Sequence, residues 1–71
     1  EAGKDGLAFI RKIIAQAGVF LKEKGRLFME IGHNQAEKVK KQLECSRKLH
    51  LVETFFDYGG KERIIVAERV N

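Results

Sequence analysis

Four polar residues that could do chemistry stand close together: Glu30, His33, Asn34 and Gln35. They fall in the stretch Arg26-Leu-Phe-Met-Glu-Ile-Gly-His-Asn-Gln-Ala-Glu37, which has the pattern of a short buried strand that stops at a glycine and passes at once into a helix. Open α/β sheets bind their ligands outside the carboxyl ends of their strands. We therefore expect these four side chains at the functional edge of a sheet.

Each of the four also has a structural interpretation. Glu30 can accept hydrogen bonds from a substrate, or it can receive backbone amides of a neighbouring loop. His33 is distant in sequence from the other histidine, so a metal-binding or general-base role is not favoured. Asn34 can cap the helix while Glu37 reaches back in a capping box, and Gln35 in the first turn can order the adjoining loop.

A second polar group surrounds two glycines near the C-terminal end of the chain. The segment Tyr58-Gly-Gly-Lys-Glu62 separates Leu51–Asp57 from Arg63–Glu68, and both flanking segments are rich in β-branched and aromatic residues. This is the pattern of a β-hairpin. Tyr58 and Arg63 could then contact a protein partner, or they could serve only as parts of the turn.

The elements that must position these residues follow in the order helix, strand, helix, strand, strand. Apolar residues at spacings of three and four predict a helix over residues 5–21, with Asp5 as its N-cap. Residues 27–31 form a short apolar run typical of a central strand, and a second helix begins at Asn34. A strand–helix–strand crossover makes the first two strands parallel, and the hairpin makes the last one antiparallel. The fold class is α/β, with a single domain over residues 1–71.

Composition limits the possible classes of function. A chain of 71 residues can build only a modest core. Its single cysteine, Cys45, excludes an internal disulfide and favours a reduced, cytoplasmic setting with the thiol half-buried on the second helix. No apolar run approaches the roughly 20 residues that span a bilayer. The phenylalanines are expected mostly in the core.

The net charge of +4 leaves one alternative open. Five cations stand within a short segment, namely Lys38, Lys40, Lys41, Arg47 and Lys48. They could make the chain a small basic α/β module that binds nucleic acid or an acidic protein partner. Nucleic-acid binding is not favoured, because glutamates are interspersed among the cations and the lysines are expected to form a solvated face, with Glu37 pairing to Lys41.

Four motifs, in order, resemble the HemK/PrmC family of protein-(glutamine-N5) methyltransferases. They are Asp5-Gly-Leu-Ala-Phe-Ile-Arg11, Leu21-Lys-x-x-Gly25, Glu30-Ile-Gly-x-x-Gln35 and Asp57-Tyr-Gly-x-x-Glu-Arg63. Members of that family use S-adenosyl-L-methionine to methylate the glutamine of the Gly-Gly-Gln motif in peptide-chain release factors, which act in translation termination. The resemblance covers nearly the whole chain, but only the C-terminal part of the family's catalytic domain. It implies part of a Rossmann-like class I methyltransferase, whose mixed sheet ends in strand 5, a helix, strand 6 and an antiparallel strand 7 placed between strands 5 and 6.

The resemblance also implies what this chain lacks. The family binds its cofactor through a glycine-rich loop and orients its substrate with Asn-Pro-Pro-Tyr, whereas this chain has no such loop and no proline. We therefore expect no catalytic, cofactor-binding or metal-binding residue here, and no activity from these residues alone. A class I methyltransferase acting on RNA, DNA or a small molecule stays open, because the substrate-selecting motif is missing. The unpaired edge of the strand over residues 27–31 invites self-association.

Overall fold

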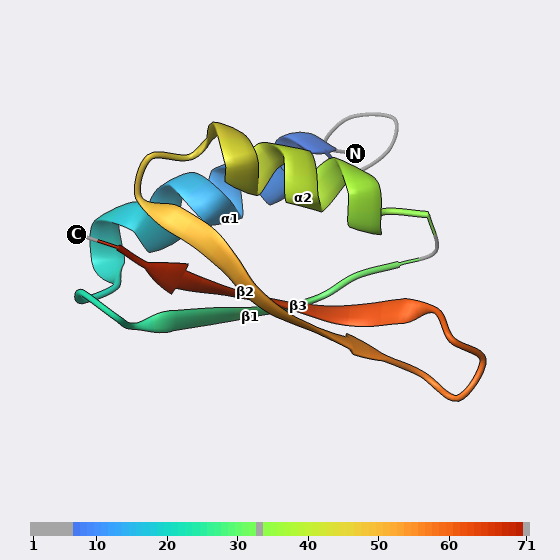
Figure 1. Cartoon of the computed structure of the whole chain (residues 1–71). Coiled ribbons are helices and arrows are strands. Elements are labelled where there is room, and N and C mark those ends of the chain that lie inside the picture. Colours follow the sequence, from blue (N-terminus) through green and yellow to red (C-terminus); the bar gives the residue numbers. More distant parts are fainter. Residues whose placement is uncertain (1–6, 33, 71) are drawn as a thin grey trace.

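Two helices lie on one face of a three-stranded sheet (Figure 1). The computed structural model describes residues 7–32 and 34–70. The elements are α1 (Leu7–Phe20), β1 (Arg26–Glu30), α2 (Ala36–Cys45), β2 (Leu49–Phe56) and β3 (Glu62–Arg69). The predicted order of elements is confirmed, with the ends shifted by up to two residues. The predicted N-cap Asp5 lies outside the described residues.

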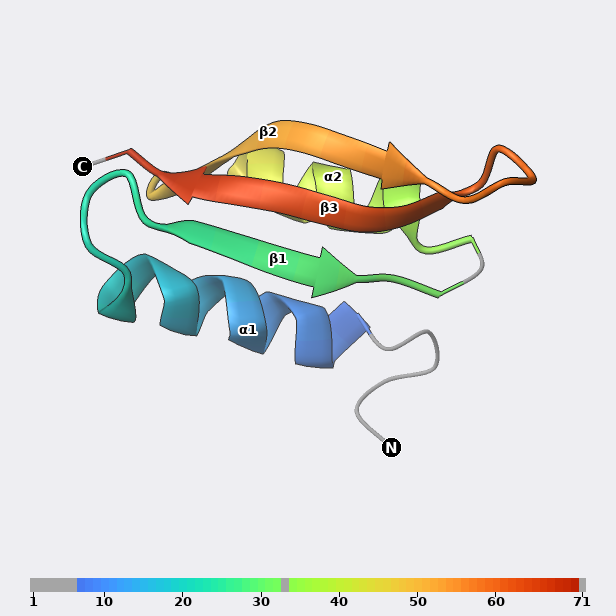
Figure 2. The ribbon, with the colours of Figure 1, turned by 90° about the horizontal axis from the view of Figure 1, so that it is seen from below.

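The strand order is β1-β3-β2, and β3 pairs antiparallel with both neighbours (Figure 2). β1 and β2 therefore run in the same direction without touching, because the hairpin returns β3 into the space between them. The predicted crossover and hairpin allow this arrangement, and the position of β3 between β1 and β2 is the one that the resemblance implied. Among the described residues both strand pairings are antiparallel, so the mixed character expected of a larger sheet is not visible in these three strands.

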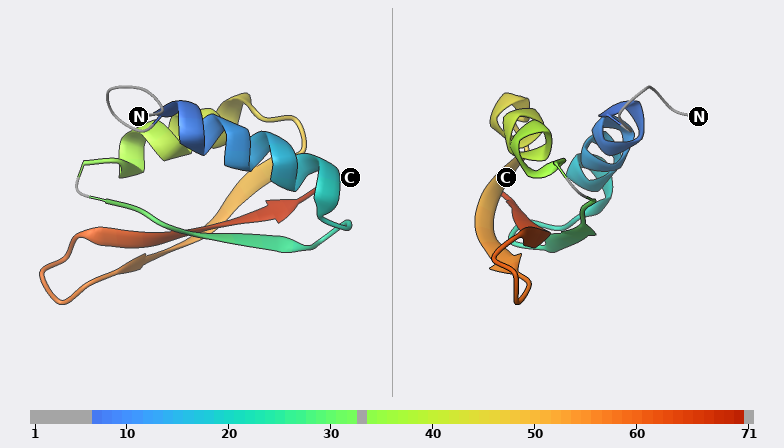
Figure 3. Two further views of the ribbon diagram at one scale, coloured as in Figure 1. Left: turned by 180° about the vertical axis from the view of Figure 1, so that it is seen from behind. Right: turned by 90° about the vertical axis from the view of Figure 1, so that its right-hand side faces the viewer.

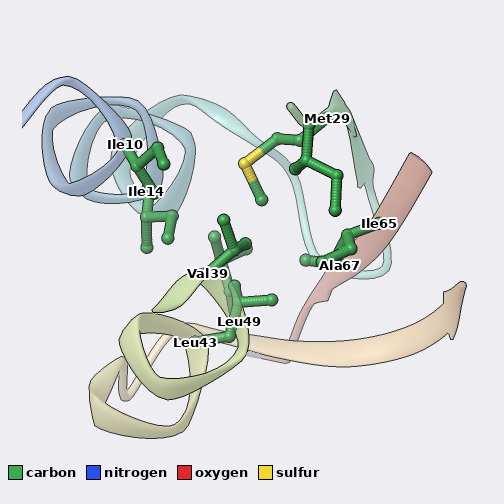
Figure 4. Close-up of a cluster of buried hydrophobic side chains, with 9 residues drawn as sticks. Ile10, Ile14, Met29, Val39, Leu43, Leu49, Ile65 and Ala67 are labelled. Atoms are coloured by element: carbon green, nitrogen blue, oxygen red, sulfur yellow. The ribbon is translucent and has the colours of Figure 1, made fainter. Parts of the chain in front are cut away.

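The core lies between the two helices and the sheet (Figure 4). α1 contributes Ile10 and Ile14, and α2 contributes Val39 and Leu43. The strands and the residues beside them contribute Met29, Ile31, Leu49, Ile65 and Ala67. The spacing of the helical residues places each pair on one helical face. The predicted apolar faces of both helices are thus confirmed. Neither described helix is long and apolar enough to cross a membrane.

The expectation that the phenylalanines lie mostly in the core is wrong. Exposed side chains are Phe9, Phe20, Phe28, Phe55 and Phe56. The reason for Phe28 and Phe55 is that both helices cover the same face of the sheet, which leaves the other face without a covering helix (Figure 3). Cys45, expected to be half-buried, is also exposed.

The bare face has an apolar part and a charged part. Ile65 and Ala67 of β3 point into the core, so the alternating residues Ile64, Val66 and Glu68 face the other way. Val66 is nevertheless only 1% exposed, because it lies on the central strand between its neighbours on β1 and β2. The cross-strand partners of these three residues on that face include Phe28 of β1 and Phe55 of β2. At the opposite end, Glu68 binds Arg26 of β1 at 3.3 Å and lies 3.6 Å from His50 of β2. We call this surface the open sheet face.

Candidate functional site

A pocket of about 360 Å³ lies where the carboxyl end of β1 meets the β2–β3 hairpin. One wall, from the β1–α2 junction and the start of α2, comprises Gly32, Asn34, Ala36 and Glu37; the other, from the hairpin, comprises Phe56, Gly60, Lys61, Glu62 and Arg63. We call it the hairpin pocket. The two walls are joined at their base, because the N–H of Ile31 donates to the carbonyl oxygen of Arg63 at 2.8 Å.

The β1–α2 junction closes differently from the predicted capping box. The helix begins at Ala36, and its N-cap is Gln35, which makes no side-chain cap hydrogen bond. Instead the Oε1 of Gln35 reaches back and accepts the N–H of Gly32 at 2.7 Å. Asn34 has φ +64°, a left-handed conformation that asparagine tolerates better than most residues. The prediction that Asn34 caps the helix with Glu37 is therefore wrong, and Glu37 lines the hairpin pocket.

Asp57 organises the hairpin loop. Its Oδ1 accepts the N–H groups of Gly59 and Lys61, both at 2.9 Å, and its Oδ2 accepts the Nε–H of Arg63 at 2.8 Å. The backbone N–H of Lys61 and the Arg63 guanidinium together hold the pKa of Asp57 below its usual value near 3.8. Gly60 has φ +83°, where glycine is strongly favoured. Asp57 was not among the predicted site residues, although an aspartate two residues before a glycine is a known signal for this kind of turn.

An ion pair fastens α2 to the start of β3. Lys40 Nζ contacts Glu62 Oε2, and both side chains are largely shielded from solvent. The hydrogen bond to Glu62 stabilises the ammonium form and raises the pKa of Lys40 above its usual 10.5. The expectation that Lys40 faces solvent is therefore wrong. The expected pair between Glu37 and Lys41 does not occur among the ion pairs of the described residues.

The basic segment does not form a single free patch. Lys40 is committed to Glu62, and the stem of Lys48 packs so closely on Gly18 that a Cβ there would lie 3.1 Å from Lys48 Cβ. Proteins that bind nucleic acid usually gather their basic side chains on one face. The contacts of Lys40 and Lys48 therefore give no support to the alternative of a small basic module.

The six predicted site residues do not gather in one place. Asn34 and Arg63 line the hairpin pocket. Glu30 and Gln35 line a second, largely apolar pocket of about 420 Å³, between α1 and the unpaired edge of β1. Tyr58 is fully exposed in the hairpin loop and lines neither pocket. His33 lies outside the described residues.

The described residues include no cluster of metal-binding side chains, and two polar groups that line the hairpin pocket are already paired within the chain. No three histidine, cysteine or acidic side chains of residues 7–32 and 34–70 lie together as metal ligands. Gly32, at the strand-to-helix turn, already donates its N–H to Gln35, and Glu62 is neutralised by Lys40. Both groups are therefore engaged in contacts within the fold.

Comparison with known proteins gives one consistent result. The chain is 42% identical over 65 residues to a release factor glutamine methyltransferase of Fusobacterium nucleatum, covering 92% of this chain and 18% of that protein. It is 40% identical over 67 residues to the protein of the same name in Aquifex aeolicus, covering 94% and 23%. With that of Pasteurella multocida it shares 46% identity over 63 residues, covering 89% and 21%. No family model and no solved structure matches the chain.

The lengths matter as much as the identities. The chain spans about a fifth of the length of the curated relatives it matches. The similarity thus extends over nearly all of this sequence and over a small part of each relative.

Proposed function

We propose that this chain, a relative of the release factor glutamine methyltransferases, forms the C-terminal part of the methyltransferase domain of a longer protein. That protein would transfer a methyl group from S-adenosyl-L-methionine to the glutamine of the Gly-Gly-Gln motif in a peptide-chain release factor. The 71 residues alone would be inactive.

The observation that carries this proposal is the sequence match itself. Identity of 40–46% extends over about nine-tenths of the chain in the three relatives compared above. The strand order β1-β3-β2 adds support, because it is the order expected if these strands are strands 5, 7 and 6 of the class I methyltransferase fold that the resemblance implies.

The surfaces of the sheet are consistent with a larger domain. Phe28, on the open sheet face, is 63% exposed, and Phe55 on the same face is also exposed. Sheets of α/β domains are normally covered on both faces, and an unpaired strand edge with apolar side chains favours pairing with another strand. The remaining four-fifths of a protein as long as the relatives would cover the open sheet face and pair with β1.

The proposed division of labour follows from the residues present. The cofactor would be held by the part of the protein outside these 71 residues, since this sequence lacks the glycine-rich loop through which the family that it resembles binds it. This chain would supply the hairpin pocket at the carboxyl edge of the sheet, beside the reacting centre. Here Asn34 and Arg63 would face the substrate, while Tyr58 would contact it from the hairpin loop.

The test is methyl transfer by the complete natural protein that contains this sequence. It is incubated with radiolabelled S-adenosyl-L-methionine and a release factor carrying either Gly-Gly-Gln or Gly-Gly-Ala. We expect label on the first release factor only, and none when the 71-residue chain replaces the complete protein. A complete protein that labels neither form refutes the proposal, and label on RNA or DNA would indicate another class I methyltransferase.

A further inference from the structure

We propose that the hairpin pocket binds an extended main-chain segment of the protein substrate. The carbonyl oxygens of that segment would face Lys61 and Arg63, and its N–H groups would face Glu37. This inference rests on the proposed function and deepens it, because it assigns a polypeptide ligand and an orientation to one pocket.

The two walls of the pocket have opposite polarity. On the hairpin wall, Lys61 has no ion-pair partner among the described residues, and Arg63 engages Asp57 through Nε, which leaves its terminal N–H groups for a ligand. On the α2 wall, the exposed Glu37 offers acceptor oxygens. The remaining carboxylate, Glu62, is neutralised by Lys40. Donors therefore stand on one side and an acceptor on the other.

A polypeptide main chain matches this arrangement, because each residue other than proline carries one N–H donor and one carbonyl acceptor. A nucleic-acid backbone does not match it. Phosphate oxygens only accept hydrogen bonds and carry negative charge, whereas the α2 wall of the pocket presents the carboxylate of Glu37, which can only accept hydrogen bonds and has no ion-pair partner among the described residues.

Exposed aromatic side chains favour a polypeptide over a small polar molecule. Phe56 lines the pocket and is exposed, and Tyr58, two residues further along the hairpin, is fully exposed. A ligand confined to the pocket would leave Tyr58 in water. A polypeptide leaving the pocket along the hairpin would cover it, and tyrosine is among the residues that contribute most to protein–protein interfaces.

The pocket is shaped before any ligand binds. Asp57 fixes the hairpin loop by three hydrogen bonds, the Lys40–Glu62 pair holds α2 against β3, and the Ile31–Arg63 backbone bond joins the two walls. A site whose walls are already ordered loses less conformational entropy on binding. Asp57 is therefore a positioning residue, which acts through Arg63 and the backbone of Lys61.

The experiment uses the complete protein and steady-state methylation of the release factor. The variants are Glu37→Lys, Lys61→Glu and the double swap, which keeps the wild-type net charge but exchanges the polarity of the walls. Because Glu37 and Lys61 are exposed, we expect all three to fold. The control is Lys41→Glu, the same charge change at an exposed position of α2 that does not line the pocket.

We expect each pocket variant to raise the KM for the release factor by about tenfold, with kcat and the KM for S-adenosyl-L-methionine changed less than about twofold. The double swap should stay impaired and the control should behave as the wild type. Unchanged KM in the pocket variants of an active enzyme overturns the inference and leaves the proposed function standing. Restoration of KM by the double swap, or competition by free glutamine at the wild-type pocket, also overturns it.

An inactive wild-type protein would instead defeat the proposed function, and a binding measurement then decides the inference separately. The probe is a fluorescent peptide spanning the Gly-Gly-Gln loop of a release factor, titrated with the complete protein. Binding that is weakened about tenfold by the double swap and not by Lys41→Glu supports the pocket assignment. Absence of binding, or equal binding by all variants, overturns it.

Discussion

Replacing Ile65 by alanine tests the core most directly. Ile65 is fully buried in the central strand β3, opposite Met29 of β1 and Thr54 of β2. Its neighbour Ile64 faces the open sheet face and is only partly buried. The pair Ile65→Ala and Ile64→Ala therefore makes the same chemical change on the two faces of one strand.

The magnitude follows from burial. Ile→Ala removes three carbon atoms, which at about 0.8 kcal/mol each amounts to about 2.4 kcal/mol of lost transfer free energy. The residual cavity adds to this, and we expect a total loss of about 3–4 kcal/mol, within the usual range for buried Ile→Ala changes. At about 0.05–0.15 kcal/mol per residue, the whole 71-residue chain has a free energy of unfolding of about 4–10 kcal/mol. Ile65→Ala should thus remove a third or more of it, whereas Ile64→Ala should cost about 1 kcal/mol.

The assay is urea unfolding of the 71-residue chain, followed by circular dichroism. Equal losses for the two variants would refute the assignment of the β3 faces. The same pair also probes the larger assembly. In the complete protein, coverage of the open sheet face would make Ile64→Ala cost about 2–4 kcal/mol. A cost that stays near 1 kcal/mol there would show that this face remains bare.

Four further predictions concern charge, assembly and cofactor. The pKa of Asp57 is lowered, so its stabilising contribution is complete above about pH 4 and is lost as the pH falls through the pKa that Asp57 has in the folded chain. Asp57→Asn should therefore flatten the acid side of a plot of stability against pH, and an unchanged acid side would contradict this. The pKa of Lys40 is raised, so its contribution to the stability of the fold is complete below about pH 10.5 and is lost at higher pH. Lys40→Met should remove this alkaline dependence and lower the stability by at most about 1 kcal/mol, as measured by thermal unfolding. The 71-residue chain should self-associate through the edge of β1, and Phe28→Lys should shift its light-scattering mass toward the monomer; a wild-type mass that is monomeric at every concentration argues against the edge. Calorimetric titration of the chain with S-adenosyl-L-methionine should show no binding, and saturable micromolar binding would contradict the assignment of the cofactor to the missing part.

Local patterns in the sequence were sufficient for the elements and their order. The apolar spacing of Ile10 and Ile14, and of Val39 and Leu43, gives each helix one buried face, and these faces form the core. The paired glycines after Tyr58 predicted the hairpin correctly. The hairpin places β3 beside β2, whereas the insertion of β3 between β1 and β2 was implied by the family resemblance and not by the turn.

Side-chain partners were less predictable, because they depend on atoms brought together from distant positions. Lys40 pairs with Glu62, 22 residues away along the chain, so its i,i+4 neighbours on α2 gave no sign of it. Asn34 had two competing roles, helix cap and left-handed turn residue, and the junction adopted the second. The polar residues predicted around the end of β1 are also divided between two pockets. Glu30 lies in the pocket along the unpaired edge of β1, and Asn34 lies in the hairpin pocket.

The sequence by itself determined the α/β class, the order of the elements, the hairpin and the family likeness, because each rests on periodicity, turn residues or motifs contained in short segments. Only the tertiary structure decided which face of the sheet is covered, which polar residues share a pocket and which charges neutralise one another. Phe28 shows the physical reason: it is exposed because it lies on an edge strand and on the face of the sheet that neither described helix covers, and both circumstances are set by distant parts of the chain.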